Sequence, residues 1–178
     1  MAEPRLLMTE EQMDASLKRV ASEICEHGLE GVTLIGIRTR GVPIAQWLAR
    51  KIEQVGGKKI PLGEIDINLY RDDLSEVGAK PVIKPTQLPF DINGKGVILV
   101  DDVLYTGRTI RAAMDALIDH GRPKFIRLMV MVDRGWREFP IQADYVARRL
   151  ETSANENVKV MLKEIDQLNQ VVVKTQHA

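Results

Sequence analysis

The stretch Val97-Ile-Leu-Val-Asp-Asp-Val-Leu-Tyr-Thr-Gly-Arg-Thr109 decides which fold this sequence predicts. Its four leading apolar residues predict a buried strand that ends at two adjacent carboxylates, Asp101 and Asp102. Thr106-Gly107 then turns the chain into a helix expected from about 108 to 120. Because ligands of parallel sheets bind beyond the carboxyl ends of the strands, both aspartates are predicted to lie at a binding site.

The rest of the chain alternates helices with apolar strands. Thr9 and Gln12 form a capping-box pattern ahead of a helix that Gly28 is expected to end. A second helix is expected over about 42–55, and buried strands over 32–37 and 125–132. Shorter strands are expected over 64–70, 145–146, 158–162 and 171–173. This alternation predicts an α/β fold in which a mostly parallel twisted sheet is flanked by helices.

The composition is that of a globular protein with one domain over 1–178. Hydrophobic residues make up 44% and charged residues 28% of the chain, and 25 basic residues balance 25 acidic ones. A net charge of zero does not argue for wholesale nucleic-acid binding, so any such role would need a local basic patch. The single cysteine, Cys25, excludes an internal disulfide framework. No apolar run approaches the roughly 20 residues of a membrane span, so we expect a cytoplasmic protein without membrane contact.

The turn Thr106-Gly107-Arg108-Thr109 has the composition of a phosphate cradle. Amide groups at a helix N-terminus attract phosphate, Gly107 permits close backbone approach, and two threonines add hydroxyl donors. The neighbouring carboxylates would repel phosphate unless another group lay between them, and a ribose, whose hydroxyls donate to Asp101 and Asp102, meets that need. The alternative is that the acid pair merely ends a strand and the turn merely begins a helix.

A second candidate anion site is Gly36-Ile-Arg-Thr-Arg-Gly41. Arg38 and Arg40 are suited to pyrophosphate because guanidinium groups match phosphate oxygens in geometry. The segment is not a Walker A loop, since the closing Gly-Lys-Ser/Thr is missing. Taken alone, both arginines are more simply interpreted as surface charges, but beside a ribose site a pyrophosphate contact is favoured.

A long loop is expected from Arg71 to Gly94. Pro81, Pro85 and Pro89 interrupt any regular element there, and the charges are mixed. Loops of this length in compact domains are often lids over a functional site, although Tyr70-Arg71-Asp72-Asp73-Leu74 is equally compatible with a solvated turn.

The string over 97–109 resembles the phosphoribosyl-pyrophosphate signature of the type I phosphoribosyltransferases. With further matching segments, the similarity extends from Met13 to about Asp166 and is to the family of pyrimidine operon attenuation regulators, which are bifunctional uracil phosphoribosyltransferases. Those segments are Gly36–Gly41, Ile67–Leu74, Val97–Asp115, Asp133–Ile141 and Ala143–Val146. The resemblance implies a type I phosphoribosyltransferase fold with a small hood over about 134–178 and a mobile loop over about 71–94.

The resemblance also implies roles for individual residues. The pyrophosphate loop of the family often has a strained or cis peptide bond, here Thr39–Arg40, and Arg71 would reach the pyrophosphate from the closing loop. Arg137 and the backbone near Val160 would contact the base. The implied catalytic residues are Asp101, Asp102, Arg40 and Arg71. The implied substrate-binding residues are Arg38, Thr39, Arg40, Gly41, Asp101, Asp102, Val103, Leu104, Tyr105, Thr106, Gly107, Arg108, Thr109, Arg137 and Val160.

The implied partners are phosphoribosyl pyrophosphate, uracil and UMP, with Mg²⁺ carried mainly by the substrate and not by direct protein ligands. A homo-oligomer, dimer or higher, is also implied, as is an mRNA leader hairpin. The matching basic face consists of Lys18, Arg19, Arg148, Arg149 and Lys159. A solvated surface of mixed charge is the alternative, because Glu23, Glu26 and Glu151 are interspersed. Lys18 and Ser22 also stand where the family carries hydroxyl or histidine side chains, which leaves specific hairpin contacts open.

Three other functions remain open on sequence grounds. The first is a phosphoribosyltransferase for another base, the second an enzyme without RNA regulation, and the third an RNA-binding regulator that uses the pocket only to sense UMP. Trp136 and Phe139 are interpreted as ordinary packing aromatics. No catalytic role is expected for His27, His120 or His177, which lie at predicted surface ends.

Overall fold

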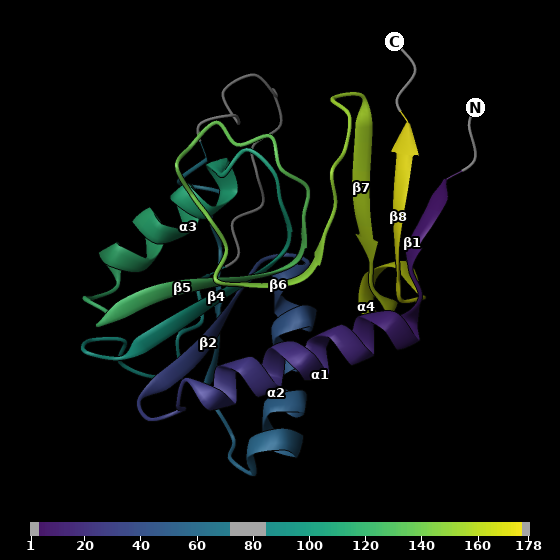
Figure 1. The fold of residues 1–178 in the computed structure, drawn as a ribbon. Helices are drawn as coiled ribbons and strands as arrows, with labels where there is room; N and C mark the ends of the chain where they lie inside the picture. Colours follow the sequence, from purple (N-terminus) through teal and green to yellow (C-terminus); the bar gives the residue numbers. More distant parts are fainter. Residues whose placement is uncertain (1–3, 72–84, 176–178) are drawn as a thin grey trace.

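The computed structural model describes residues 4–71 and 85–175. A five-stranded sheet lies at its centre with the strand order β3-β2-β4-β5-β6 (Figure 1). Its strands are β2 (Val32–Ile37), β3 (Leu62–Ile65), β4 (Gly96–Leu104), β5 (Phe125–Asp133) and β6 (Tyr145–Arg149). Every pairing in this sheet is parallel, which confirms the predicted α/β architecture.

Helices cover both faces of the parallel sheet, as its apolar strands predicted. Alternate residues of β4 point to opposite faces, so Ile98 and Val100 pack with α1 (Glu10–Glu26) and α2 (Gly41–Gly56). Val97 and Leu99 pack on the other side with α3 (Arg108–Asp119), and Figure 1 shows α3 across the sheet from α1 and α2. The expected capping box at Thr9 and Gln12 begins α1.

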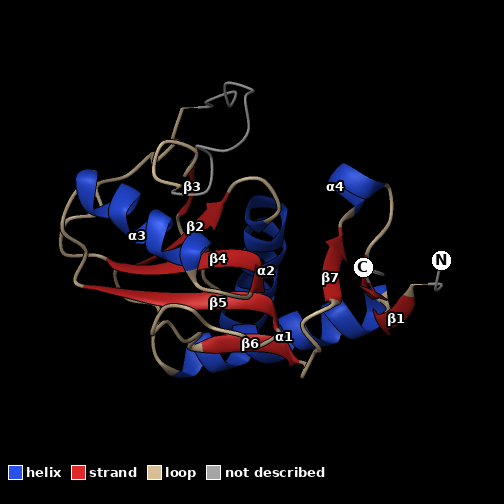
Figure 2. Cartoon of the chain, turned by 90° about the horizontal axis from the view of Figure 1, so that it is seen from above, coloured by secondary structure: helices blue, strands red, loops and turns tan. Residues whose placement is uncertain are grey.

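A second, antiparallel sheet forms the hood. It has the order β1-β8-β7 and is built from β1 (Arg5–Met8), β7 (Glu156–Met161) and β8 (Gln170–Thr175), with the short helix α4 (Lys163–Asp166) between β7 and β8. Figure 2 shows this sheet to one side of the parallel sheet. The C-terminal segment expected as hood or edge therefore divides, because β6 completes the parallel sheet while β7 onward joins β1. The strand β1 was not predicted.

The predicted strand over 64–70 is wrong beyond Ile65. The side chain of Asp66 accepts a hydrogen bond from the Asn68 amide at 2.9 Å, and the Tyr70 amide donates to the Ile67 carbonyl at 2.9 Å. These local bonds turn the chain, so β3 ends at Ile65 even though apolar residues continue to alternate beyond it.

The loop expected over 71–94 is also shorter than predicted at its far end, and residues 72–84 lie outside the described part. Glu64 and Gln87 exchange two backbone hydrogen bonds of 2.8 and 2.9 Å. Leu88 and Phe90 then pack against the core beneath α3, where Ile92 is buried. The alternation of apolar residues over 88–92 thus attaches this stretch to the sheet despite its prolines.

Candidate active site

The strand β4 is longer than the apolar run predicted, and it carries Asp101 and Asp102 inside its final residues. Asp101 is paired with Val130 of β5 and is only 6% exposed, while Asp102 is half-buried. The strand was expected to end at these carboxylates, but the parallel sheet continues past them to Leu104. Hydrogen bonds hold the pair, as the Asp102 amide donates to Asp101 Oδ1 at 2.9 Å and the Val103 amide to Asp102 Oδ1 at 2.8 Å.

Burial raises the pKa of both carboxyl groups. For Asp101 the main cause is desolvation, the Asp102 carboxylate raises its pKa further, and the Arg71 guanidinium opposes the rise. For Asp102 desolvation again dominates, and Arg40 is among the groups that lower its pKa. The fields of Arg71 and Arg40 therefore reach the acid pair, so the fold brings these catalytic candidates into one region. Burial makes the ionised form of this pair unfavourable, so a ligand with hydroxyl donors or positive charge would stabilise the two carboxylates.

The turn expected to hold a phosphate begins a helix, as the sequence predicted. Gly107 precedes α3 with a φ of 93°, a left-handed conformation that favours glycine, and the Arg108 amide donates to the Thr106 hydroxyl at 3.3 Å. The adjoining cavity of about 290 Å³ is lined by Val103, Leu104, Tyr105, Thr106, Gly107, Arg108, Thr109, Ile110 and Arg71. Every residue expected on this loop therefore lines the cavity, and the first turn of α3 presents its positive dipole end there.

The loop Gly36–Gly41, expected to bind pyrophosphate, borders a second cavity, of about 470 Å³. Arg38 and Thr39 line it together with Glu64, Asp66 and Arg71, so Arg71 is common to both cavities. Gly41 allows α2 to approach β4, since a Cβ there would lie 2.2 Å from the Val100 carbonyl oxygen. The cis peptide bond of the loop is Arg38–Thr39, one position before the expected Thr39–Arg40.

Both arginines of this loop are engaged with protein groups. Arg38 pairs with Glu64 at 2.8 Å and donates to the Pro85 carbonyl at 2.8 Å. Arg40 donates to the Val160 carbonyl of β7 at 3.0 Å and forms a two-point ion pair with Asp166. The Arg40 guanidinium holds the pKa of Asp166 well below its usual range. In this structure Arg40 thus links the loop to the hood, and the pyrophosphate contact expected of it stays a prediction.

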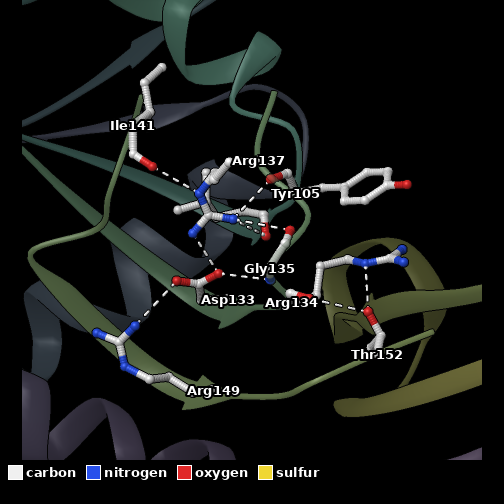
Figure 3. A network of polar contacts seen from close by, with 9 residues as sticks. Tyr105, Asp133, Arg134, Gly135, Arg137, Ile141, Arg149 and Thr152 are labelled. Atoms are coloured by element: carbon white, nitrogen blue, oxygen red, sulfur yellow. Dashed lines mark hydrogen bonds and ion pairs between the residues drawn. The ribbon is translucent and has the colours of Figure 1, made fainter. Parts of the chain in front are cut away.

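The segment after β5, expected to contact the base, forms a polar network (Figure 3). Arg137 donates to the Tyr105 carbonyl at 2.9 Å and pairs with Asp133 at 2.6 Å. The guanidinium is thus bonded to protein groups, whereas a base contact was expected of it. Trp136 is 52% exposed with its indole N–H on the Thr152 carbonyl, so it is not the packing aromatic that was predicted. Phe139 does pack, beneath the guanidinium of Arg108 at 5.0 Å from its ring centre.

Several polar residues of the site received no role from sequence reasoning. Asp133 and Arg134 are both buried at the end of β5, and Asp166 holds Arg40 from the hood. Asp133 could have been found, because a carboxylate ending a buried strand is the same signal that identified Asp101. Asp166 gave no such signal, since its partner lies 126 residues away in the sequence.

The predicted RNA-binding residues lie on α1, β6 and β7. Arg19 donates to the Val146 and Ala147 carbonyls at 2.9 and 3.0 Å, so α1 and β6 are adjacent. Arg149 pairs with Asp133 at 3.3 Å and Lys159 with Asp166 at 3.1 Å. Lys18 and Arg148 are exposed. α1 and β6 therefore lie side by side, and Arg19 joins them through the β6 carbonyls.

Within residues 4–71 and 85–175, no group of three or more His, Cys, Asp or Glu side chains is arranged to hold a metal ion. None of the helices in the same ranges is long and apolar enough to cross a membrane. Cys25 is a half-buried free thiol whose pKa is raised by burial, which disfavours the reactive thiolate.

Comparisons with known proteins agree with this geometry. The family described as "Phosphoribosyl transferase domain" matches residues 8–164. A "Bifunctional protein PyrR" of Thermus aquaticus is 55% identical over 162 residues, 90% of each chain. Another from Clostridioides difficile is 52% identical over 176 residues, 98% of this chain and 99% of its own. Among solved structures, a hypoxanthine phosphoribosyltransferase from Trypanosoma cruzi shares the fold, with a TM-score of 0.75, 24% identity and coverage of 97% and 95%. The chain therefore belongs to the phosphoribosyltransferase family, and within it to the bifunctional PyrR proteins.

Proposed function

We propose that this protein is a uracil phosphoribosyltransferase, which converts uracil and phosphoribosyl pyrophosphate into UMP and pyrophosphate. One observation carries the proposal: the cavity lined by Val103–Ile110 and the cavity lined by Arg38 and Thr39 share Arg71. The first suits a 5′-phosphate at the start of α3, and the second suits a pyrophosphate. Membership of the bifunctional PyrR proteins supports the same reaction.

In the proposed reaction the bond from ribose C1′ to a pyrophosphate oxygen breaks, and its electron pair leaves with pyrophosphate. N1 of uracil forms the new bond to C1′ and loses its proton. Asp101 and Asp102 would orient the ribose hydroxyls and stabilise the positive charge that develops on the sugar. The amides at the start of α3 would hold the 5′-phosphate. Because uracil itself attacks C1′, the reaction needs no covalent nucleophile from the protein.

Mg²⁺ is proposed as the cofactor, carried mainly by pyrophosphate and ribose oxygens. This ion prefers oxygen ligands and retains several waters, so it needs few protein donors. The raised pKa of Asp101, caused by burial and by the Asp102 carboxylate, fits a neighbouring cation that would favour ionisation of the pair. When bound, Mg²⁺ would supply positive charge that neutralises the departing pyrophosphate.

We also propose that the protein binds an mRNA leader hairpin in a UMP-dependent manner, regulating pyrimidine operon transcription by attenuation. The word "bifunctional" in the names of the relatives supports a second activity. Exposed basic residues on α1 and β6, such as Lys18 and Arg148, would offer phosphate contacts for recognition of hairpin shape. Cytoplasmic location, a homo-oligomeric assembly and a single domain over 1–178 complete the proposal, and light scattering would test the assembly.

The deciding experiment is incubation with phosphoribosyl pyrophosphate, Mg²⁺ and each nucleobase in turn, with pyrophosphate release as the readout. We expect release with uracil, abolished by chelation of Mg²⁺. Faster turnover of orotate or hypoxanthine would contradict the base assignment. Binding of UMP without turnover of any base would instead identify a regulator that uses the pocket as a sensor.

A further inference from the structure

All the hydrogen bonds of the Arg137 guanidinium that the structure describes go to protein groups. Its Nε donates to the Ile141 carbonyl at 2.8 Å, and its Nη2 reaches Asp133 Oδ1 at 2.6 Å. Its Nη1 faces three carbonyl oxygens, of Tyr105 at 2.9 Å, Gly135 at 3.2 Å and Leu104 at 3.5 Å. Figure 3 shows the guanidinium at the centre of these groups. Every nitrogen of the fork therefore has a protein partner, and the side chain acts as a bridge between backbone segments.

The bridged segments belong to different parts of the site. Leu104 and Tyr105 line the cavity at the start of α3, whereas Ile141 lies on the segment that leads to β6. Backbone bonds add to the bridge, because the Glu138 and Phe139 amides donate to the Thr106 carbonyl at 2.9 and 3.0 Å. The position of the phosphate cradle is thus set partly by the segment after β5.

Asp133 orients this bridge. Its carboxylate is 7% exposed, and its Oδ1 accepts from both Arg137 and the Gly135 amide, at 2.6 and 3.1 Å. Its Oδ2 faces Arg149 at 3.3 Å. A buried carboxylate needs such partners, and a charged hydrogen bond restricts the orientation of the arginine fork. Arg134 braces the same loop, since its guanidinium lies over the Tyr105 ring at 4.0 Å and donates to the Thr152 hydroxyl at 3.2 Å.

We propose that Asp133 and Arg137 are positioning residues for phosphoribosyl binding, which hold the Leu104–Thr106 backbone in place for the 5′-phosphate. The inference rests on the proposed function, because that function assigns the cavity at α3 to the phosphoribosyl group. It replaces the direct base contact that was expected of the Arg137 side chain. Neither residue touches the ligand in this role, and both act through the backbone carbonyls that Arg137 bridges.

The two roles of Arg137 predict different losses. A base contact would change the KM for uracil and leave the affinity for phosphoribosyl pyrophosphate alone, since that ligand contains no base. If Arg137 positions the cradle, its loss would weaken the binding of phosphoribosyl pyrophosphate even when no base is present. Affinity for phosphoribosyl pyrophosphate with Mg²⁺, measured by calorimetry without uracil, therefore separates the two roles.

The variants are Arg137→Lys, Arg137→Gln and Asp133→Asn. Lysine can still pair with Asp133, but one ammonium group cannot bridge Tyr105 and Ile141 as the fork does. We expect each variant to bind phosphoribosyl pyrophosphate about 10- to 100-fold more weakly, the size of effect that a small misplacement produces, with Arg137→Lys the mildest. Because the two residues act as a unit, the Asp133→Asn/Arg137→Gln double variant should bind little worse than the weaker single variant.

Arg50→Gln is the matched control, because Arg50 is an exposed arginine of α2 outside both cavities. This variant should bind phosphoribosyl pyrophosphate as tightly as the wild type does. Circular dichroism identifies the folded variants, and Arg137→Lys decides the question should the others fail to fold. Unchanged affinity in folded variants, with any loss confined to the KM for uracil, would overturn the inference.

Wild-type protein that binds phosphoribosyl pyrophosphate but uses another base contradicts only the proposed base, and the titration still decides the positioning role. Wild-type protein that binds no phosphoribosyl pyrophosphate would overturn both.

Discussion

At the scale of single residues, Asp101 combines a cost to stability with a role in the proposed reaction. Burial and the Asp102 carboxylate raise its pKa, so the folded protein holds this proton more tightly than the unfolded chain does. By linkage, the free energy of unfolding then falls as pH rises from the ordinary aspartate value of about 3.9 through the raised pKa. Asn lacks this ionisation, and its Oδ1 can still accept the bond from the Asp102 amide. Asp101→Asn should therefore raise Tm at neutral pH, by an amount that disappears as the pH is lowered towards 4.

The same residue should show the opposite effect on activity. Asp101→Asn combined with Asp102→Asn should lower kcat by roughly 10²-fold or more, because ribose orientation and charge stabilisation are lost. Thermal unfolding from pH 4 to 8 and pyrophosphate release test the two effects. Asp115→Asn, at an exposed position of α3, serves as the control for both. Near wild-type turnover in the folded double variant would remove the acid pair from the site, and a Tm gain independent of pH would contradict the role of burial.

At the scale of elements, Arg40 connects the start of α2 to the hood through Val160 and Asp166. The hood is expected to cover the base, which UMP contains and phosphoribosyl pyrophosphate lacks. Arg40→Ala should therefore weaken the binding of UMP at least as much as the binding of phosphoribosyl pyrophosphate. The expected loss for UMP is about 10-fold, in the range of a charged hydrogen bond. Titration of both ligands by calorimetry measures the ratio.

Lys51→Gln is the control for this change, because Lys51 lies on the same helix and its ion pair with Asp14, at 2.7 Å, joins α2 to α1. Its loss should change stability without changing the ratio of the two affinities. A loss in Arg40→Ala that is confined to phosphoribosyl pyrophosphate would return Arg40 to the pyrophosphate contact that the sequence suggested.

At the scale of the whole molecule, zero net charge means that any attraction to RNA must come from a local patch. Arg148 is exposed on β6, so Arg148→Gln should weaken hairpin binding and reduce its salt slope by about one unit. Arg19→Gln should in addition lower Tm, because Arg19 also holds two carbonyls of β6. UMP should tighten RNA binding, and linkage requires RNA to tighten UMP binding by the same factor.

Gel-shift titrations against a pyrimidine-operon leader hairpin, at several salt concentrations and with or without UMP, measure these effects. Lys58→Gln, at an exposed position after α2, is the control for a lost surface charge. Binding no tighter than to an unrelated hairpin, and indifferent to UMP, would leave the protein as an enzyme alone.

The sequence by itself determined the parallel sheet, its covering helices and the Gly107 turn that begins α3, because these depend on local periodicity, capping and one glycine. Asp101, Asp102 and Val103–Thr109 are contiguous, so their spacing alone predicted that they lie near one another. Tertiary structure alone decided the partners of Arg40 and Arg137, since Asp166, Val160 and Tyr105 approach them from distant positions in the chain. It also decided β1, which pairs Arg5 with Val173 at the opposite end of the sequence. Contacts between distant segments leave no local pattern, and a guanidinium can satisfy either a phosphate or a protein carbonyl until the fold selects one of them.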